Sequence, residues 1–308
     1  MMNKKVTIVL ATYNGELYLR EQLDSIFNQS FLDYQVLIGD DCSTDNTVKI
    51  IKEYQLKYQN IHLLRNAKRL GHVSNFENLI SQVDNGYIAL CDQDDIWYED
   101  KLLEAMGTLE SFTDMNLPML FHSDLVGIDI KKVKLYDSFF EKRGYSFPKK
   151  RSIDIMLGRS GVMGNTMVFN QALKEKILPF PKDLIVHDYW IALVNEFMGK
   201  RITYPNALIK YRIHESNTSQ TFRASSKSFF RKKIILPYHN IQREKVLEEF
   251  KERFIVKGED FAILNTFLDY LYFKKNKIFL ISLLSRYNFF RLGFSYKLKL
   301  YGAIIWKK

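Results

Sequence analysis

Two features common in secreted and membrane-spanning proteins are missing from this sequence. Its 308 residues include only two cysteines, Cys42 and Cys91, which are too few for a disulfide framework and lack the spacing of a structural zinc site. No stretch reaches the ~18 to 20 uncharged apolar residues that a membrane-spanning helix needs, and residues 278–285, one of the longest, fall well short. We therefore expect a protein of a reducing, cytoplasmic setting.

A signal peptide and internal repeats are also missing. Lys4 and Lys5 precede an apolar run, but that run ends at Ala11 and no small-residue cleavage pattern follows it. We interpret the run as a buried strand. With 46% hydrophobic and 26% charged residues, the chain is typical of one globular catalytic domain with an appendage.

The positive charge is concentrated in the C-terminal part of the sequence. The net charge is +10, but residues 221–308 hold 19 Lys and Arg against seven Asp and Glu, a balance of +12, which leaves the first 220 residues at −2. A nucleic-acid-binding protein is one hypothesis, and it depends on this tail alone. The nearly neutral remainder argues against it, so we expect no nucleic-acid partner.

Short apolar runs rich in β-formers alternate with segments of helical periodicity. The runs begin near Val6, Tyr34, Ile61, Tyr87 and Pro118. This alternation predicts an α/β fold in which a mostly parallel central sheet is flanked by helices. Ligands of such sheets bind beyond the carboxyl ends of the strands, so the residues that end the strands are the first candidates for chemistry.

Other local signals place further elements. The cap-forming residues 43–45 predict the start of a helix. Further along, residues 165–169 are strand-like, a helix is expected after residues 187–188, and residues 224–226 mark a hinge into the basic tail. We interpret the second half of the first 220 residues as an acceptor-side elaboration of the same domain.

Three of the expected strands end in polar, acidic segments. These are residues 11–15 (ATYNG), 39–45 (GDDCSTD) and 91–95 (CDQDD). A core does not bury unpaired carboxylates, because desolvation costs too much, so such a cluster needs partners, a cation or water. Solvated turns and helix caps would explain any one segment alone. All three in this order favour a ligand-binding edge.

The triplet Asp92-Gln93-Asp94 follows the apolar run at residues 87–90. Hard cations such as Mg²⁺ or Mn²⁺ prefer oxygen ligands, and a nucleoside diphosphate needs such a cation to neutralise its leaving-group charge. One carboxylate can bind the metal while its alternate neighbour faces the ribose. The triplet therefore indicates a metal-dependent nucleotide site.

A series of motifs matches the order and spacing of a known family over about the first 220 residues. They are residues 12–15 (TYNG), 40–45 (DDCSTD), 71–76 (GHVSNF), 92–97 (DQDDIW) and 187–190 (HDYW). By this series the sequence resembles the family 2 glycosyltransferases, and it looks most like the bacterial rhamnosyltransferases that build cell-wall and capsular polysaccharides. The resemblance implies the GT-A fold, a single nucleotide-binding α/β domain whose second half carries the acceptor region.

The resemblance also implies a donor site. Its members are Thr12, Tyr13, Asn14, Asp41, Arg65, Lys68, Asp92 and Gln93. Thr12 and Tyr13 would line the base pocket, and Asp41 would accept the ring imide N–H that uracil and thymine both present. Arg65 or Lys68 would approach the diphosphate from a basic loop, for which a solvated loop is the open alternative.

The resemblance further implies a metal site and a catalytic base. The metal, Mg²⁺ or Mn²⁺, would be held by Asp94 and by His214, which falls where relatives often carry a histidine that closes the metal or diphosphate site, with the charge of Arg212 nearby. Asp188 matches the family's catalytic carboxylate, which takes the proton of the acceptor hydroxyl as the new bond forms. A helix cap is the alternative for Asp188, and it is compatible with catalysis because helix N-termini favour a carboxylate.

Four residues are expected along the acceptor cleft: Asp124, Asn165, His187 and Trp190. The sequence departs from the commonest family pattern at Cys42, where glycine is usual, and at Gly39, where a branched apolar residue is frequent. Neither departure removes a functional group, so the resemblance stands.

The predicted activity is an inverting, metal-dependent transfer of a sugar to a saccharide acceptor, expected to be lipid-linked, in bacterial surface polysaccharide biosynthesis. The expected donor is deoxythymidine-diphosphate rhamnose. A uridine-diphosphate hexose donor and a catalytically silent partner subunit are the alternatives.

Residues 1–220 are expected to form the catalytic domain, with a nucleotide-sugar half at 1–115 and an acceptor half at 116–220. Residues 221–308 would form a helical extension in which Lys and Arg interleave with aromatic residues, as at 229–235 and 286–291. Such helices lie in the interface of an anionic membrane, so we expect a peripheral location on the inner face of the cell membrane. A helical cap with a basic solvent face is the alternative.

Overall fold

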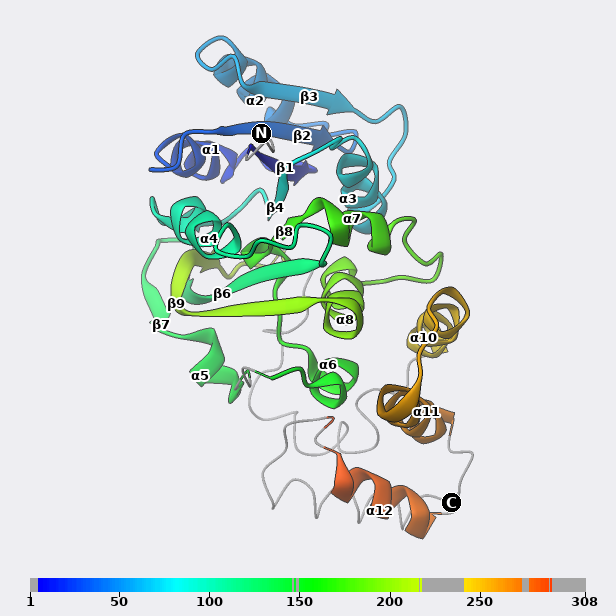
Figure 1. Ribbon diagram of the computed structural model, residues 1–308. Helices are drawn as coiled ribbons and strands as arrows, with labels where there is room; N and C mark the ends of the chain where they lie inside the picture. The colour runs from blue at the N-terminus through cyan, green and yellow to red at the C-terminus, as the bar shows by residue number, and fades with distance from the viewer. Residues whose placement is uncertain are drawn as a thin grey trace. The chain divides into compact units, whose positions relative to one another are not determined.

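The computed structural model describes residues 5–145, 147, 150–215, 217, 241–272, 277–287 and 289, and the chain divides into two compact units. Unit 1 consists of Met1–Arg151, Val162–Phe180 and Val186–His214. Unit 2 consists of Ser152–Gly161, Pro181–Ile185 and Glu215–Lys308. Unit 1 carries the sheet, whereas the elements described in unit 2 are helices (Figure 1).

Four parallel strands form the first half of the sheet. They are β1 (Val6–Thr12), β2 (Tyr34–Asp40), β3 (Ile61–Arg65) and β4 (Tyr87–Cys91), in the order β3-β2-β1-β4. Val6 pairs with Tyr34 on one side and Tyr87 on the other. Every residue of β1 and β4 is buried, as expected for interior strands of a parallel sheet with helices on both faces. These four strands begin where the sequence predicted.

The second half of the sheet is mixed. It contains β8 (Val168–Asn170), β6 (Met119–Ile128), β9 (Lys200–Arg212), β5 (Ile96–Trp97) and β7 (Lys134–Tyr136). β6 and β9 form a long parallel pair, whereas β8, β5 and β7 make short antiparallel ones, so the mostly parallel sheet is confirmed. The segment predicted as a strand at residues 165–169 begins instead with a 3₁₀ turn, η1 (Gly164–Thr166).

Helices flank the sheet of unit 1. They are α1 (Leu19–Phe27), α2 (Thr47–Gln55), α3 (His72–Ser81), α4 (Lys101–Leu109), α5 (Phe139–Arg143), α7 (Gln171–Ile177) and α8 (His187–Met198). α1 buries Leu19, Leu23 and Ile26 on one face, as its periodicity predicted. α2 begins after the predicted residues 43–45, because the Asp45 carboxylate accepts hydrogen bonds from the N–H and hydroxyl of Thr47.

Unit 2 contains α6 (Ile153–Arg159), α10 (Ile241–Arg253), α11 (Gly258–Tyr272) and α12 (Lys277–Arg286). Its buried residues include Phe250, Phe267 and Phe289. The expected C-terminal helices are therefore present, and no described helix is long and apolar enough to cross a bilayer. The expected hinge at 224–226, the stretch at 229–235 and residues 288, 290 and 291 of the stretch 286–291 lie outside the described residues.

Candidate active site

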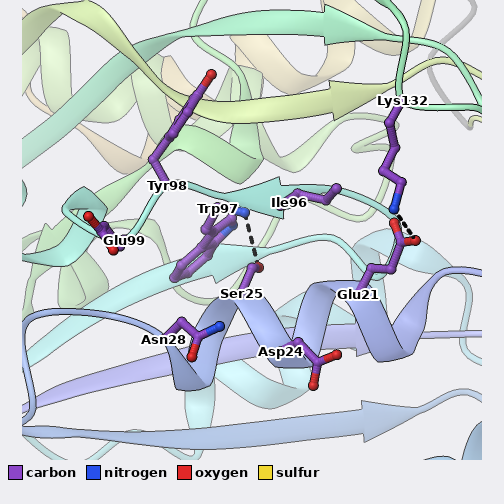
Figure 2. A pocket seen from close by; sticks show the side chains of 9 residues that line it. All are labelled: Glu21, Asp24, Ser25, Asn28, Ile96, Trp97, Tyr98, Glu99 and Lys132. Carbon is purple, nitrogen blue, oxygen red and sulfur yellow. Dashed lines mark hydrogen bonds and ion pairs between the residues drawn. The ribbon is translucent and has the colours of Figure 1, made fainter.

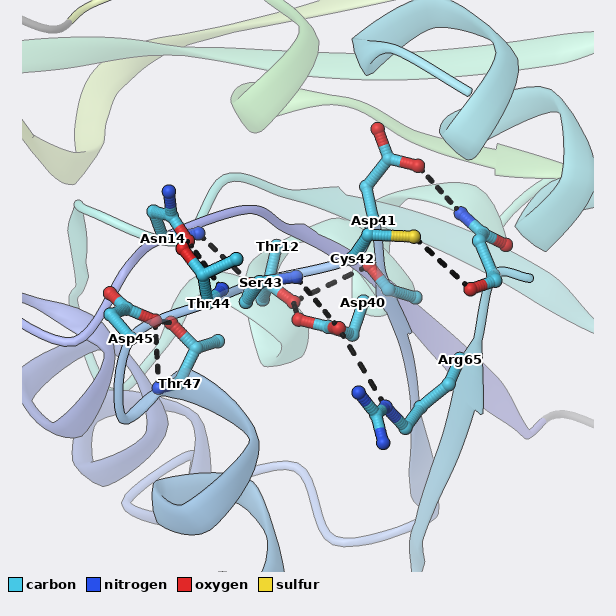
Figure 3. Close-up of polar contacts among 12 residues, drawn as sticks. Thr12, Asn14, Asp40, Asp41, Cys42, Ser43, Thr44, Asp45, Thr47 and Arg65 are labelled. Atoms are coloured by element: carbon cyan, nitrogen blue, oxygen red, sulfur yellow. Dashed lines mark hydrogen bonds and ion pairs between the residues drawn. The ribbon is translucent and has the colours of Figure 1, made fainter. Parts of the chain in front are cut away.

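The predicted site residues of the first half lie at one edge of the sheet. β1, β2 and β4 are neighbours and run in the same direction, so Thr12, Asp40 and Cys91 end at the same side. The loops that follow β1 and β2 are bonded to one another (Figure 3). The acidic segments after these strands therefore meet, as the topology of an open α/β sheet requires.

Thr12 and Asn14 fix the loop after β1 to the loop after β2. Thr12 is 2% exposed, and its hydroxyl contacts the backbone oxygen of Gly39 at 3.4 Å. Asn14 has a φ of 48°, its N–H donates to the Ser43 hydroxyl at 2.9 Å, and its side-chain oxygen accepts from the N–H of Thr44 at 2.9 Å. Both side chains thus shape the loops after β1 and β2. The side chain of Thr12 is too buried to line an open base pocket.

Gln93 ties the loop after β4 to the loop after β1. Its Oε1 accepts from the N–H of Tyr13 at 2.9 Å, and its Nε2 donates to the backbone oxygen of Tyr13 at 3.1 Å. A Cβ at Gly15 would overlap the Gln93 amide, so only glycine leaves room for this pairing. Gln93, expected in the donor set, therefore holds Tyr13 in place through the main chain.

Asp41 organises the basic loop that follows β3. Its carboxylate accepts hydrogen bonds from the N–H groups of Leu70 and Gly71, at 2.7 and 2.8 Å, and from the side chain of Asn66 at 3.0 Å. Of its two oxygens, Oδ2 accepts only from Gly71, which leaves capacity for a further donor such as a base imide. The next residue, Cys42, has a φ of 65°, which accounts for the family's preference for glycine there.

The basic loop contributes a residue that the sequence did not single out. The guanidinium carbon of Arg69 lies 3.9 Å from the ring centroid of Tyr13, in a cation–π contact at the end of β1. Of the two residues predicted instead, Arg65 lies 4.0 Å from the buried Asp40 carboxylate, and Lys68 is exposed. In the sequence, Arg69 is marked only by its position in a basic loop. Its contact with Tyr13, the aromatic residue after β1, depends on the fold.

The structure brings together the two predicted metal ligands. Nε2 of His214 lies 2.8 Å from Oδ2 of Asp94, and the two side chains are 10% and 14% exposed. Among the described residues, no group of three or more His, Cys, Asp or Glu side chains is arranged to hold a metal ion. A carboxylate and an imidazole nevertheless fit a cation that takes its remaining ligands from a diphosphate and water.

Arg212, at the end of β9, positions the loop that carries Asp94. It is 1% exposed; its Nε donates to the backbone oxygen of Asp94 at 2.9 Å, and its N–H donates to the Asp95 carboxylate at 3.0 Å. The guanidinium also pairs with Glu21 of α1 at 2.5 Å and lies over the ring of Tyr18. Arg212 thus holds the loop that carries Asp94, a predicted metal ligand, whereas the sequence suggested only that its charge was nearby.

Asp95 and Asn165 belong to a buried layer beneath the site. Asp95 is fully buried and accepts from the Asn165 side chain at 2.5 Å. The backbone oxygen of Asn165 accepts from Nζ of Lys101, which is itself buried and lies 3.1 Å from the Trp97 ring centroid. Asn165, expected in the acceptor cleft, instead joins η1 to the loop after β4.

Asp188 and Asp92 carry carboxyl groups whose pKa values are raised. Burial raises the pKa of Asp188 to about 6, and hydrogen bonds from the N–H groups of Tyr189 and Gly164 oppose the shift. Burial, Asp94 and Asp188 raise the pKa of Asp92 to about 7, against the opposing charge of Lys101. The charge of Asp188, at the start of α8, thus acts on Asp92, in the loop after β4.

Asp124 and Trp190 have structural roles that differ from the expected acceptor contacts. Asp124 is 3% exposed, and its carboxylate accepts from the N–H groups of Phe139 and Phe140 and from the Ser138 hydroxyl at the start of α5. Trp190 is fully buried, and its indole N–H donates to the backbone oxygen of Ile177 at 2.8 Å. Neither side chain faces a cleft, because tertiary packing covers both.

A hollow of about 450 Å³ lies along α1, β5 and the residue Lys132 (Figure 2). None of the predicted site residues lines it. Lys132 pairs there with Glu21 at 2.9 Å, and Glu21 in turn pairs with Arg212. The hollow therefore borders Glu21, which pairs with Arg212, but it is not the predicted donor site.

Comparison with known proteins identifies the family. The model of glycosyl transferase family 2 matches residues 7–178, which is more than half of the chain. The chain belongs to that family. A dTDP-rhamnosyl transferase of Shigella flexneri, RfbG, is 46% identical over 105 residues, which are 32% of this chain and 36% of the relative. A glycosyltransferase of Methanocaldococcus jannaschii is 26% identical over 73% of this chain and 81% of its own length.

Solved structures support the GT-A fold of this family 2 glycosyltransferase. Residues 1–349 of Staphylococcus aureus TarS, in complex with UDP-GlcNAc, superpose with a TM-score of 0.57 at 17% identity, covering 97% of this chain and 89% of that one. The mannosyltransferase PcManGT of Pyrobaculum calidifontis, in complex with GDP-Man and Mn²⁺, gives a TM-score of 0.54 at 17% identity, covering 97% and 84%. At these identities the likeness establishes the fold alone.

Proposed function

We propose that this glycosyltransferase is an inverting, metal-dependent enzyme that transfers a sugar from a nucleoside diphosphate to a saccharide acceptor. The observation that supports the proposal is the 2.8 Å contact of Asp94 with His214 in the loop after β4, where the charge of Asp188 also acts on Asp92. A metal-holding pair on one side and a base on the other are the two parts that such a transfer needs.

Asp94 and His214 would hold the cation, which would neutralise the charge that develops on the leaving diphosphate. The imidazole of His214 favours Mn²⁺ over Mg²⁺, because Mg²⁺ prefers an all-oxygen set of ligands. Asp188 would take the proton of the acceptor hydroxyl as its oxygen bonds to the anomeric carbon. A pKa of about 6 suits this role, since the carboxylate is ionised at neutral pH and still a stronger base than an ordinary Asp.

The base of the donor would lie between Tyr13, with Arg69 against its ring, and the Asp41 carboxylate. Oδ2 of Asp41 has acceptor capacity for an imide N–H, which uracil and thymine carry and which cytosine lacks. Arg65 and Lys68 remain the candidates for the diphosphate. These contacts support a uridine or deoxythymidine diphosphate donor.

We infer that the donor is deoxythymidine-diphosphate rhamnose and that the product is part of a bacterial surface polysaccharide. The support is the 46% identity to the dTDP-rhamnosyl transferase over a third of the chain, together with the weaker likeness to the teichuronic acid glycosyltransferase of Bacillus subtilis, TuaG. A UDP-hexose donor is the second candidate, supported by the fold shared with TarS bound to UDP-GlcNAc. A lipid-linked acceptor and a basic tail on the membrane belong to the same proposal.

The test is turnover with the full-length protein, Mn²⁺, a panel of nucleotide sugars and polyprenyl-linked saccharide acceptors. Asp188→Asn should keep the affinity for the donor and lose transfer by at least a hundredfold, because the amide cannot accept the proton. Near-normal turnover of this variant would remove Asp188 as the base. Absence of turnover by the wild type with every donor would favour the catalytically silent partner subunit.

A further inference from the structure

His187 is a buried histidine whose ring nitrogens are both unused. It is the first residue of α8, is 4% exposed, and neither Nδ1 nor Nε2 has a hydrogen-bond partner among the residues that the structure describes. Its ring stacks on Phe76 with centroids 4.3 Å apart and 26° between the planes. Buried polar atoms without partners destabilise a fold, so two of them next to Asp188 point to a ligand that supplies their hydrogen bonds.

His72 extends the surface around this histidine. It is the first residue of α3, its ring centroid lies 5.1 Å from that of His187, and its ring meets Phe76 edge-on at 5.0 Å. His72 is exposed, so its ring is open to a ligand that reaches His187. The two histidines therefore form one imidazole pair beside Asp188.

This inference rests on the proposed function, whose chemistry determines which part of the substrates lies beside the two histidines. The anomeric carbon must lie between the leaving diphosphate, on the Asp94 side, and the base, Asp188. We propose that His72 and His187 form the subsite for the transferred sugar, with the two nitrogens of His187 bonded to its hydroxyl groups. The acceptor role first expected for His187 is thereby replaced by a donor-sugar role.

The local packing suits this ligand. Burial lowers the pKa of His187 well below its ordinary value, so the imidazole is neutral and offers one donor and one acceptor, as a sugar hydroxyl does. A Cβ at Gly164 would stand 3.0 Å from Nε2 of His187 and 3.5 Å from Cβ of Asp188. A side chain at Gly164 would press on the imidazole beside the base, and Phe76, which is 1% exposed, stacks on the ring, so the position of the ring is fixed before a ligand binds.

The experiment compares the binding of a nucleoside diphosphate with that of its sugar ester, in the presence of Mn²⁺, by calorimetry on the full-length protein. The probes are dTDP, dTDP-rhamnose, UDP and UDP-glucose. His187→Phe keeps the stacked ring and removes both nitrogens. It should weaken binding of the nucleotide sugar at least tenfold and change that of the bare diphosphate less than twofold. His187→Gln, which restores a donor and an acceptor, should recover part of the loss.

A matched control is His62→Phe, because His62 is an exposed histidine of β3 outside the proposed subsite; all four affinities should stay at wild-type values. Thermal melting of each variant shows whether it folds. Equal weakening of diphosphate and sugar ester by His187→Phe would indicate a structural role and overturn the inference, as would unchanged affinity for both. If the wild type binds none of the four probes, the proposed function itself fails and this inference falls with it.

Discussion

Nε2 of His214 lies 2.8 Å from Oδ2 of Asp94, although the two residues are 120 positions apart in the sequence. His214 follows the last strand of unit 1, whereas Asp94 follows β4. The antiparallel pairing of β5 with β9 brings these segments together, because Ile96 is opposite Lys210. The order of the strands, more than any local signal, therefore creates the proposed metal pair.

Arg212 holds the loop that carries Asp94, so its loss should lower both the stability of the protein and its metal-dependent nucleotide binding. Arg212→Met should destabilise the protein by about 1–3 kcal/mol, because it removes the guanidinium bonds to the backbone oxygen of Asp94 and to the Glu21 carboxylate. Arg212→Lys should recover little, since an ammonium cannot reproduce the two guanidinium bonds to Asp94 and Glu21. Denaturant unfolding and Mn²⁺-dependent nucleotide binding measure the two consequences.

The control for that prediction is Arg20→Met on α1, the helix that also carries Glu21. Arg20 pairs with Glu53 at 2.5 Å, but its side chain is 51% exposed. An exposed pair contributes at most about 1 kcal/mol, so this variant should melt and bind nucleotide almost as the wild type does. Similar losses for both variants would contradict the positioning role of Arg212.

Asp188 should lower the stability of the folded protein at neutral pH. Its folded pKa of about 6 lies above the value of an unfolded Asp, so the folded state loses relative stability as the pH rises from about 4 to 6. Asp188→Asn removes this penalty and should stabilise the protein by about 2 kcal/mol at pH 7, with little gain at pH 4. Denaturant unfolding at both pH values is the measurement. A loss of stability at pH 7 would show that the carboxylate is held by favourable contacts.

The pH dependence of transfer should report the same group. Because the base must be ionised, kcat/KM should be constant above pH 7 and fall about tenfold per pH unit below pH 6. Measurement of Mn²⁺-dependent nucleotide affinity over the same range separates this effect from a loss of donor binding. A rate that rises on acidification would be incompatible with Asp188 as the base.

Cys42 offers a test of the backbone after β2. Its φ of 65° is unfavourable for a residue with a side chain, so Cys42→Gly should stabilise the protein by about 0.5–1 kcal/mol and leave nucleotide binding unchanged. Cys91→Ala is the matched control, since Cys91 is fully buried in β4 and its truncation should destabilise. Thermal unfolding of the two variants gives the comparison, and a destabilised Cys42→Gly would mean that the contact of Sγ with the Asn66 oxygen outweighs the strain.

The strands and their acidic ends were predictable because they depend on local pattern. The starts of β1 to β4 follow from apolar runs of strand length, and a parallel sheet then forces residues 11–15, 39–45 and 91–95 to one edge. The helix α2 begins two residues after the cap-forming residues 43–45, because several such residues follow one another and the pattern does not reveal where the first helical residue lies; Asp45 instead accepts a bond from Thr47, the first residue of the helix.

The parts that the sequence did not reveal depend on long-range packing. Asp124 and Trp190 are polar or amphipathic residues at positions where acceptor contacts were expected. Their hydrogen-bond partners, Ser138 and Ile177, are known only once the chain is folded. The support role of Arg212 and the contact of Arg69 with Tyr13 likewise join segments far apart in sequence. No periodicity encodes such contacts.

The most direct test of the central claim, a metal-dependent nucleotide site at this edge, is calorimetric binding of dTDP and UDP to the purified protein with and without Mn²⁺, for the wild type and Asp94→Ala. The account predicts that at least one nucleotide binds the wild type tightly only with Mn²⁺, and that Asp94→Ala removes this metal-dependent affinity. Binding that is equally strong without metal, or unaffected by Asp94→Ala, would contradict it.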